Sequence, residues 1–392
     1  MLLKALQKQN PALVEAALLL WQQGAIKPDS YVIDVDQVRR NASLLLETAA
    51  RHGITLYLMS KQFGRNPLLC KLLLECGYQG IVAVDFKEAR QLYQHDLPVA
   101  HVGHLVQIPS GMVDEVVSRQ PEVITVYSIA KAREIAEAAL RQGIEQALLL
   151  KVWHPNDLVY PGQEAGFTLD ELPITIKEIK ALAGVRLVGV THFPCMLFDS
   201  EKGKTLPSPN LSTLIEAKSI LEREGIHVEQ VNGPSATCVE SIPLLAHYGV
   251  THAEPGHSLT GTMPSNQQGE QPEHVAMLYL TEISHHHQGR SYCYGGGYYR
   301  RGHLSHALVH DQQWHSSKVL SPAADSIDYT LSLTDPFAVG CPVVMCFRTQ
   351  IFVTRSDVAL VAGIHSGQPR LLGIYDSQGN TIPTPTEQGG YE

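Results

Sequence analysis

The sequence predicts an α/β protein, a (β/α)8 barrel followed by a mainly antiparallel β domain. The chain has 392 residues, which exceeds the usual size of one domain, so two domains are expected. Eight short apolar runs alternate with helical patterns between residues 34 and 259, and this alternation is typical of parallel βαβ units. Beyond residue 259 the helical patterns stop and β-rich runs follow.

The predicted barrel strands are each preceded by a helical stretch. The strands are Thr55–Met59, Gly80–Val84, Pro98–Val102, Glu122–Val126, Ala147–Val152, Arg186–Val190, His227–Val231 and Val250–Glu254. The helices are Asp36–Arg51, Asn66–Cys76, Phe86–Tyr93, Met112–Arg119, Ala130–Arg141, Leu172–Leu182, Leu211–Glu224 and Ala236–His247. Eight units are the number that closes a barrel. An open doubly wound sheet is the alternative, but it usually carries G-x-G-x-x-G after its first strand, where this chain has Ser60–Gly64.

These patterns divide the chain into three segments. Residues 1–28 are expected to form a helical extension that packs on the β domain, residues 29–262 the barrel, and residues 263–392 the C-terminal β domain. A polar stretch rich in Gly and Pro at 261–272 suits a linker. The β runs beyond it are Val275–Ile283, Ser291–Tyr294, Ala307–Val309, Val343–Val353, Val358–Ile364 and Leu371–Tyr375.

Composition narrows the class of protein. The formal net charge of −9 argues against a surface for nucleic acid or anionic lipid, which a basic patch would mark. The seven cysteines include no C-x-x-C pair and have irregular spacing, which indicates reduced thiols. No apolar run reaches the roughly 20 residues that span a bilayer. We therefore expect a cytoplasmic protein with a small-molecule substrate, no nucleic acid and no membrane partner.

The polar residues at the strand ends are the candidates for chemistry, because active sites of such barrels lie at the C-terminal ends of the strands. Lys61 follows the first strand. A partly dry surrounding there would disfavour its charged form and leave a nucleophilic amine of the kind that forms imines. The alternative is an ordinary solvated lysine at a strand end.

Two glycine-containing loops follow the seventh and eighth strands, at Asn232–Ser235 and Pro255–Ser258. Phosphate sites often form there in these barrels, although ordinary loop and capping chemistry explains such residues as well. Glu254 ends an apolar strand, and a buried carboxylate needs a partner, either a protonated ring nitrogen or a nearby Lys or Arg. His192 would stack on a flat ring or join a polar network, unless it is merely a satisfied strand-end histidine.

Three consecutive histidines, His285–His287, suggest a metal site. Consecutive residues in a strand-like turn point in different directions and seldom share one ion. Zinc-type spacing of Cys and His is absent elsewhere in the sequence. We therefore expect no metal site.

Four short motifs resemble the fold-type III pyridoxal-phosphate family, which holds alanine racemase and the ornithine/diaminopimelate-type decarboxylases. They are Tyr57–Lys61, Gly189–Phe193, Asn232–Thr237 and Ala253–His257. The resemblance implies pyridoxal 5'-phosphate, held by Lys61 as a Schiff base. It also implies that Glu254 pairs with the ring nitrogen and His192 lies beside the cofactor. The phosphate would be bound by Ser235 with its neighbour Asn232, and by Gly256 and His257.

The sequence departs from both branches of this family. Racemases place an arginine at the ring nitrogen, so Glu254 indicates decarboxylase-like electronics. The segment Ser321–Asp328 resembles the decarboxylase G-P-x-C-D-x-x-D segment and supplies Asp325, but Ala324 replaces the cysteine, which disfavours decarboxylation. The racemase arginine at the ring hydroxyl is replaced within Gly162–Phe167, which offers Gln or Glu.

Racemases of this family take a second base, a tyrosine, from the partner subunit. Tyr294 is the first candidate and Tyr298 the next, unless this region is only a core or surface cluster of tyrosines. The resemblance thus implies a homodimer with shared active sites. It favours an amino-acid racemase or epimerase, an isomerase of amino-acid metabolism. The alternatives are an amino-acid decarboxylase, a non-catalytic cofactor-binding protein and a cofactor-free Schiff-base aldolase.

Overall fold

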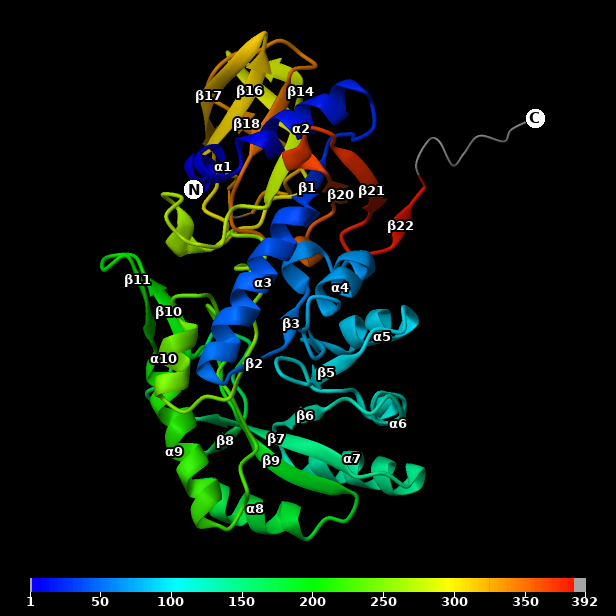
Figure 1. Cartoon of the computed structure of the whole chain (residues 1–392), viewed down its shortest axis with the longest axis vertical. Coiled ribbons are helices and arrows are strands. Elements are labelled where there is room, and N and C mark those ends of the chain that lie inside the picture. The colour runs from blue at the N-terminus through cyan, green and yellow to red at the C-terminus, as the bar shows by residue number, and fades with distance from the viewer. Residues whose placement is uncertain (1, 324, 384–392) are drawn as a thin grey trace, which may run out of the picture. The chain divides into compact units, whose positions relative to one another are not determined.

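The computed structural model describes residues 2–323 and 325–383 and shows two compact units (Figure 1). The barrel unit consists of Leu44–Ser60 and Cys70–Gly256, and the β unit of Met1–Ser43, Lys61–Leu69 and His257–Glu392. The predicted fold class, a barrel of parallel strands with a separate β domain, is confirmed. The chain passes from the β unit to the barrel unit within α3 (Val35–His52).

The barrel is a ring of parallel strands in the order β2-β13-β12-β9-β7-β6-β5-β4-β3. Its first predicted strand is interrupted at Tyr57, so that β2 pairs with β13 while β3 pairs with β4. The N–H of Tyr57 donates to the carbonyl of Ala253, which keeps the two pieces in one ring. The bounds are β2 (Thr55–Leu56), β3 (Leu58–Met59), β4 (Ile81–Ala83), β5 (Val99–Val102), β6 (Val123–Val126), β7 (Gln146–Trp153), β8 (Phe167–Thr168, paired with β7), β9 (Val185–Thr191), β12 (Gln230–Asn232) and β13 (His252–Ala253).

The barrel helices follow the predicted pattern, with α7 and α9 packed against β7 and β9, and α8 against β9 (Figure 1). Helix α7 begins after Ser128, whose hydroxyl accepts from the Lys131 N–H, and ends at Gly143 in the left-handed region. Asp85 caps α5 in the same way. The bounds are α4 (Pro67–Leu74), α5 (Phe86–Gln94), α6 (Val113–Ser118), α7 (Ile129–Gln142), α8 (Leu172–Lys180), α9 (Pro209–Arg223) and α10 (Ile242–His247). A hairpin of β10 (Met196–Asp199) and β11 (Lys204–Pro207), absent from the prediction, follows β9.

The β unit holds a sheet in the order β15-β18-β17-β16-β19-β14-β1-β20-β21-β22. Strand β1 pairs antiparallel with β14 and parallel with β20. It therefore belongs to this sheet, although the sequence analysis assigned residues from 29 onward to the barrel. The bounds are β1 (Ser30–Asp34), β14 (Met277–His287), β15 (Arg290–Tyr294), β16 (His306–Asp311), β17 (Gln313–Leu320), β18 (Thr330–Leu333), β19 (Pro342–Met345), β20 (Asp357–Ala362), β21 (Arg370–Tyr375) and β22 (Thr381–Ile382).

Helices α1 (Leu3–Gln9) and α2 (Pro11–Gln22) pack on this sheet. Leu6 and Leu13 share one buried apolar cluster with Leu278 and Val344. Asn10 joins the layers, because its side chain accepts from the Leu13 N–H and donates to Asp34 and to the Val275 carbonyl. Burial of the apolar faces of both helices, which neither could hide alone, accounts for this packing.

The seven cysteines are free. Within the described ranges, no helix is both long and apolar enough to cross a membrane.

Candidate active site

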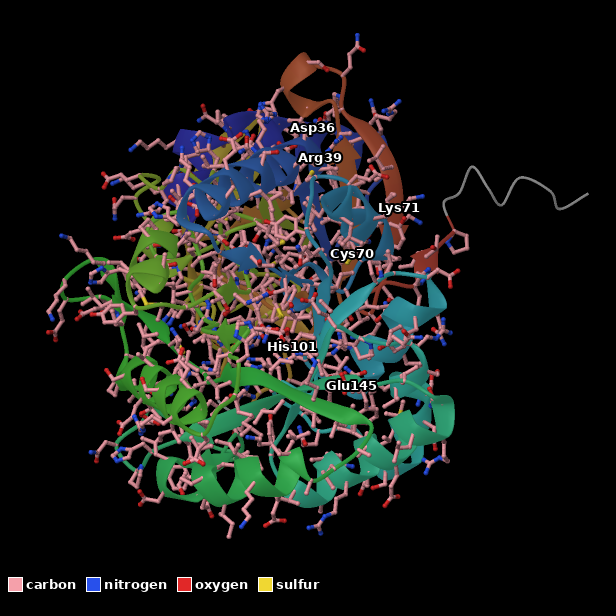
Figure 2. All side chains as sticks on the ribbon, turned by 60° about the horizontal axis from the view of Figure 1, so that its bottom comes forward. Asp36, Arg39, Cys70, Lys71, His101 and Glu145 are labelled. Atoms are coloured by element: carbon pink, nitrogen blue, oxygen red, sulfur yellow. The ribbon has the colours of Figure 1, made fainter. Side chains whose placement is uncertain are left out.

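A fully buried polar network lies inside the barrel unit, around Glu254. The Oε1 atom of Glu254 lies 2.9 Å from Nδ1 of His101 in β5 and 2.7 Å from Nδ2 of Asn232 in β12. The Nε2 atom of the same histidine lies 2.6 Å from Oγ1 of Thr125 in β6. Figure 2 labels His101, which is fully buried, near the middle of the view. Two strands, β5 and β12, thus supply partners to the carboxylate, and a third, β6, bonds to it only through His101.

Glu254 is ionised, and one of its two carboxylate oxygens has no hydrogen-bond donor among the described residues. Burial raises its pKa, but the electrostatic effect of His104, the hydrogen bond of His101 and the amide of Asn232 outweigh burial and leave the pKa well below its usual range. The Oε2 atom accepts no hydrogen bond from any residue that the structure describes, and the Nε2 atom of His104 lies 3.9 Å from it. A buried acceptor of this kind needs a donor, and an N–H of a bound molecule would supply it.

His192, which follows β9, has both ring nitrogens engaged. Its Nε2 lies 2.7 Å from Oδ2 of Asp157, and its Nδ1 accepts from the Phe193 N–H at 2.9 Å. The carboxylate of Asp157 is itself fixed by the His154 N–H and the Thr213 hydroxyl. Burial lowers the pKa of His192 despite the nearby carboxylate, so the ring is neutral. What remains available to a ligand is the face of the imidazole.

The loop after β12 has an unusual backbone. Ser235 and Ala236 have φ values of 98° and 45°, a region that residues other than glycine seldom adopt. The loop is braced, because the Gly233 N–H donates to the carbonyl of His252 and the Ser241 hydroxyl donates to that of Ala236. Strained backbone held in this way clusters at ligand-binding sites.

Lys151 lies at the end of β7 and is buried. Its Nζ donates to the Gln163 carbonyl at 3.1 Å and lies 5.0 Å from the centre of the Tyr127 ring. Burial lowers the pKa of Lys151 to about 8, against the opposing charge of Glu164.

Lys61 is half-buried and begins the short helix η1 (Lys61–Phe63). Ser60, the residue before it, donates its hydroxyl to Glu88 in the barrel unit.

In the β unit, the Nε atom of Arg348 donates to Nε2 of His257 at 3.2 Å. Burial, with the charges of Arg348 and Lys61, holds the pKa of His257 well below its usual range. His257 is therefore a neutral acceptor among cations. Arg348 escaped the sequence analysis because it belongs to none of the motifs.

The tyrosine candidates lie on one part of the β unit. Tyr294 ends β15 with 45% of its surface exposed. Asp328 fastens the neighbouring loop, because its carboxylate accepts from the N–H groups of Gly296 and Tyr298 and pairs with Arg355 at 3.1 Å. Asp325, the candidate from sequence, is exposed in the loop that also holds Asp328. Ala324 lies outside the described residues. A cavity of about 480 Å³ is lined there by Tyr298, Tyr299, Arg300, Arg301, Pro322, Ala323, Ser326, Asp328 and Val353.

Two groups of histidines are candidate metal ligands, one around Glu254 and one at the end of β14. His101, His104 and Glu254 offer ligand atoms that all lie within 4.8 Å of one another. The amide nitrogen of Asn232, however, lies 2.7 Å from the carboxylate and 3.1 Å from His101, and its N–H dipoles oppose a cation. A hydrogen-bonded network therefore explains this cluster better. The side chains of His285–His287 are exposed at the end of β14.

Comparison with known families covers most of the chain. Residues 33–264 match the family described as "Alanine racemase, N-terminal domain", and residues 278–371 match "YhfX-like, C-terminal domain". The protein YhfX of Escherichia coli strain K12 is 59% identical over 385 residues, which are 97% of this chain and 100% of that protein.

Solved structures share the fold at low identity. D-threonine aldolase from Filomicrobium marinum has a TM-score of 0.66 at 13% identity and covers 91% of this chain and 95% of its own. Alanine racemase from Clostridium difficile 630 has a TM-score of 0.65 at 16% identity, and the match covers 89% of this chain and 98% of that protein. D-threo-3-hydroxyaspartate dehydratase from Delftia sp. HT23 has a TM-score of 0.65 at 15% identity, and the match covers 88% of this chain and 97% of that protein. These likenesses show the shared fold. The family matches and the 59% identity to YhfX show that the chain belongs to the alanine racemase N-terminal domain family and carries a YhfX-like C-terminal domain.

Proposed function

We propose that this protein is a pyridoxal-phosphate-dependent enzyme that acts at the α-carbon of an amino acid, by racemisation or epimerisation. The observation that carries the proposal is the free Oε2 of the ionised, buried Glu254. A protonated pyridine nitrogen supplies the donor that this oxygen lacks. The enzyme would work in the cytoplasm on a small amino-acid substrate.

The residues present fit this cofactor. The neutral ring of His192 offers a flat face whose orientation is fixed at both nitrogens. The strained backbone at Ser235, next to Asn232 and Gly233, suits a phosphate group, as do Gly256 and His257 in the second loop. Lys61 would hold the cofactor through its Nζ atom. Bound pyridoxal phosphate withdraws electrons from the substrate α-carbon.

The chain's own groups would then move a proton at that carbon. The amine of Lys61 would take or return it on one face, and the hydroxyl of Tyr294 or Tyr298 on the other. Asp325 would contact the substrate from the same loop as Asp328. Decarboxylation is the second candidate, favoured by the carboxylate of Glu254 in place of a cationic partner. A non-catalytic binding role remains the outcome if cofactor binds without α-carbon chemistry.

A homodimer is part of this proposal. Several apolar side chains near the tyrosine loop are largely exposed: Tyr294 at 45%, Val353 at 56%, Ile327 at 62% and Tyr329 at 71%. Exposed apolar groups gathered in this way mark interaction surfaces. A second copy of the chain would cover them and share its tyrosine.

The experiment is an absorption spectrum of the purified protein with added pyridoxal phosphate, before and after borohydride. We expect a visible band that borohydride abolishes and that a Lys61→Ala variant lacks. Lys71→Ala, at an exposed lysine of α4, is the control and should keep the band. Screening amino acids for α-proton exchange in deuterated water then separates racemisation from decarboxylation, which releases carbon dioxide. Absence of the band in the wild type would refute the proposal.

A further inference from the structure

We propose that His101 and Thr125 are positioning residues that orient the carboxylate of Glu254 and keep it ionised, so that its Oε2 faces the ring nitrogen of the bound cofactor. The role toward the ring nitrogen rests on the proposed function. The hydrogen-bond chain itself, from β6 through β5 to the end of β13, is a property of the barrel unit.

The direction of each hydrogen bond follows from the chemistry of the groups. An ionised carboxylate only accepts, so the Nδ1 atom of His101, 2.9 Å from Oε1, must carry a proton. We assign His101 the tautomer with a single ring proton, in which Nε2 accepts and the Thr125 hydroxyl at 2.6 Å is its donor. Thr125 thereby selects the tautomer of His101 that donates to Glu254.

The two oxygens of Glu254 consequently differ. Oε1 receives the N–H groups of His101 and Asn232, whereas Oε2 receives none from the described residues. Two donors on one oxygen fix the plane of the carboxylate, and hydrogen bonds to the charged form stabilise it. The second oxygen, Oε2, is thus oriented to accept from a ring N–H, and its negative charge favours protonation of that ring nitrogen.

Burial makes this arrangement sensitive to single changes. The side chains of His101 and Glu254 are 0% exposed, and Thr125 is 0% exposed. Water cannot replace a lost donor there, so removal of His101 leaves Oε1 with one donor and lets the carboxylate turn or take up a proton. His252 is a suitable control, because its ring bonds to Thr251 and not to Glu254.

The first measurement uses the protein without cofactor. Nitrogen-15 NMR of histidine-labelled protein should show His101 as the Nδ1–H tautomer, identified by the loss of its signals in His101→Gln. Thr125→Val should change that tautomer population, and Thr125→Ser should restore it. A wild-type His101 found as the Nε2–H tautomer would overturn the proposal.

The second measurement uses pyridoxal phosphate labelled with nitrogen-15 in its ring. We expect a protonated ring nitrogen in the wild type and in His252→Gln, and a shift towards the unprotonated value in His101→Leu. Cofactor affinity should fall roughly tenfold to hundredfold in His101→Leu and by a smaller factor in Thr125→Val. If His101→Leu does not fold, the result for Thr125→Val tests the proposal, because this substitution removes only a hydroxyl.

The outcomes separate this inference from the proposed function. Failure of the wild type to bind pyridoxal phosphate refutes the proposed function, while the tautomer measurement still tests the chain from Thr125 to Glu254. Wild-type affinity and a protonated ring nitrogen in both variants would refute the inference alone. Stoichiometric Zn²⁺ binding that disappears in His101→Gln would also refute it, in favour of a metal site.

Discussion

The carboxylate of Asp157 lies 2.7 Å from the Nε2 atom of His192 and fixes the tautomer of this buried ring. Because Nδ1 accepts from a backbone N–H, the proton must sit on Nε2. A histidine with both nitrogens engaged is a poor acid or base and a good flat surface. This pairing leaves only the face of the His192 ring for a ligand, which supports the stacking role proposed for it.

Replacement of Asp157 by alanine should destabilise the protein by about 1–3 kcal/mol, because the N–H of His192 would be buried without a partner. Urea denaturation at neutral pH measures this change. The control is Glu134→Ala, which breaks a partly exposed ion pair with Lys131 at the surface and should change the stability by less than about 0.5 kcal/mol. Equal effects of the two substitutions would contradict a structural role for Asp157.

Acid should destabilise the protein well above the pH at which carboxylates protonate. Burial lowers the pKa of His252 to about 4 and holds that of His257 well below its ordinary value. In the unfolded chain these groups titrate near about 6.5, so between about 4 and 6.5 the unfolded state binds more protons. Stability should therefore be full above about 6.5 and fall as pH decreases towards 4. His252→Gln should flatten this slope in denaturation midpoints measured across the range, by on the order of 2 kcal/mol. An unchanged slope would contradict the assignment.

The carboxyl group of Asp29 should have the opposite effect on stability, which it lowers as pH rises. Burial, with smaller contributions from Asp357 and Asp328, raises its pKa to about 6 against the effects of Ser356 and Arg355. The folded state thus binds this proton more tightly than the unfolded chain, and the stabilisation present at low pH is lost as pH rises through about 6. Asp29→Asn should raise the melting temperature at pH 8 and have little effect at pH 4.5. A loss of stability at pH 8 would show that the carboxylate serves another purpose.

Substitution of Gly296 should be costly, because the backbone there is in the left-handed region and the Asp29 side chain lies close. This glycine has φ of +126°, and a Cβ atom there would collide with the carboxylate of Asp29. Gly289, in the turn between β14 and β15, has φ of +73°, and a Cβ atom added there would meet no other atom within 4 Å. Gly289→Ala should therefore cost only backbone strain, about 1 kcal/mol, and Gly296→Ala clearly more. Thermal unfolding of both variants tests this, and equal costs would contradict the close contact.

If the proposed function holds, one tyrosine should control one face of the α-carbon. Tyr294→Phe or Tyr298→Phe should slow α-proton exchange of one enantiomer roughly 10²–10⁴-fold and spare the other. Tyr248→Phe is a matched control, because Tyr248 is 44% exposed and Tyr294 45%. Equal slowing of both enantiomers would point to substrate binding rather than proton transfer. The measurement is exchange into deuterated water for each enantiomer separately.

Much of the barrel was predictable from sequence because local periodicity encodes it. Each predicted strand overlaps a strand of the structure, and α7 differs from its predicted range by one residue at each end. Strands β17 and β18 were missed, since their polar residues hide the β pattern. His101 was missed as well. A polar residue inside the apolar strand β5 was the available signal, because a buried polar group requires a partner.

The sequence by itself determined the barrel, the β domain and the candidates at the strand ends, since hydrophobic periodicity and motifs are local. Tertiary structure decided which groups meet. His101 and Glu254 are 153 residues apart in the chain and share a hydrogen bond, and β1 pairs with β20 across more than 300 residues of chain. Such pairs arise when distant strands become neighbours and buried groups find partners, a geometric requirement that no local pattern records.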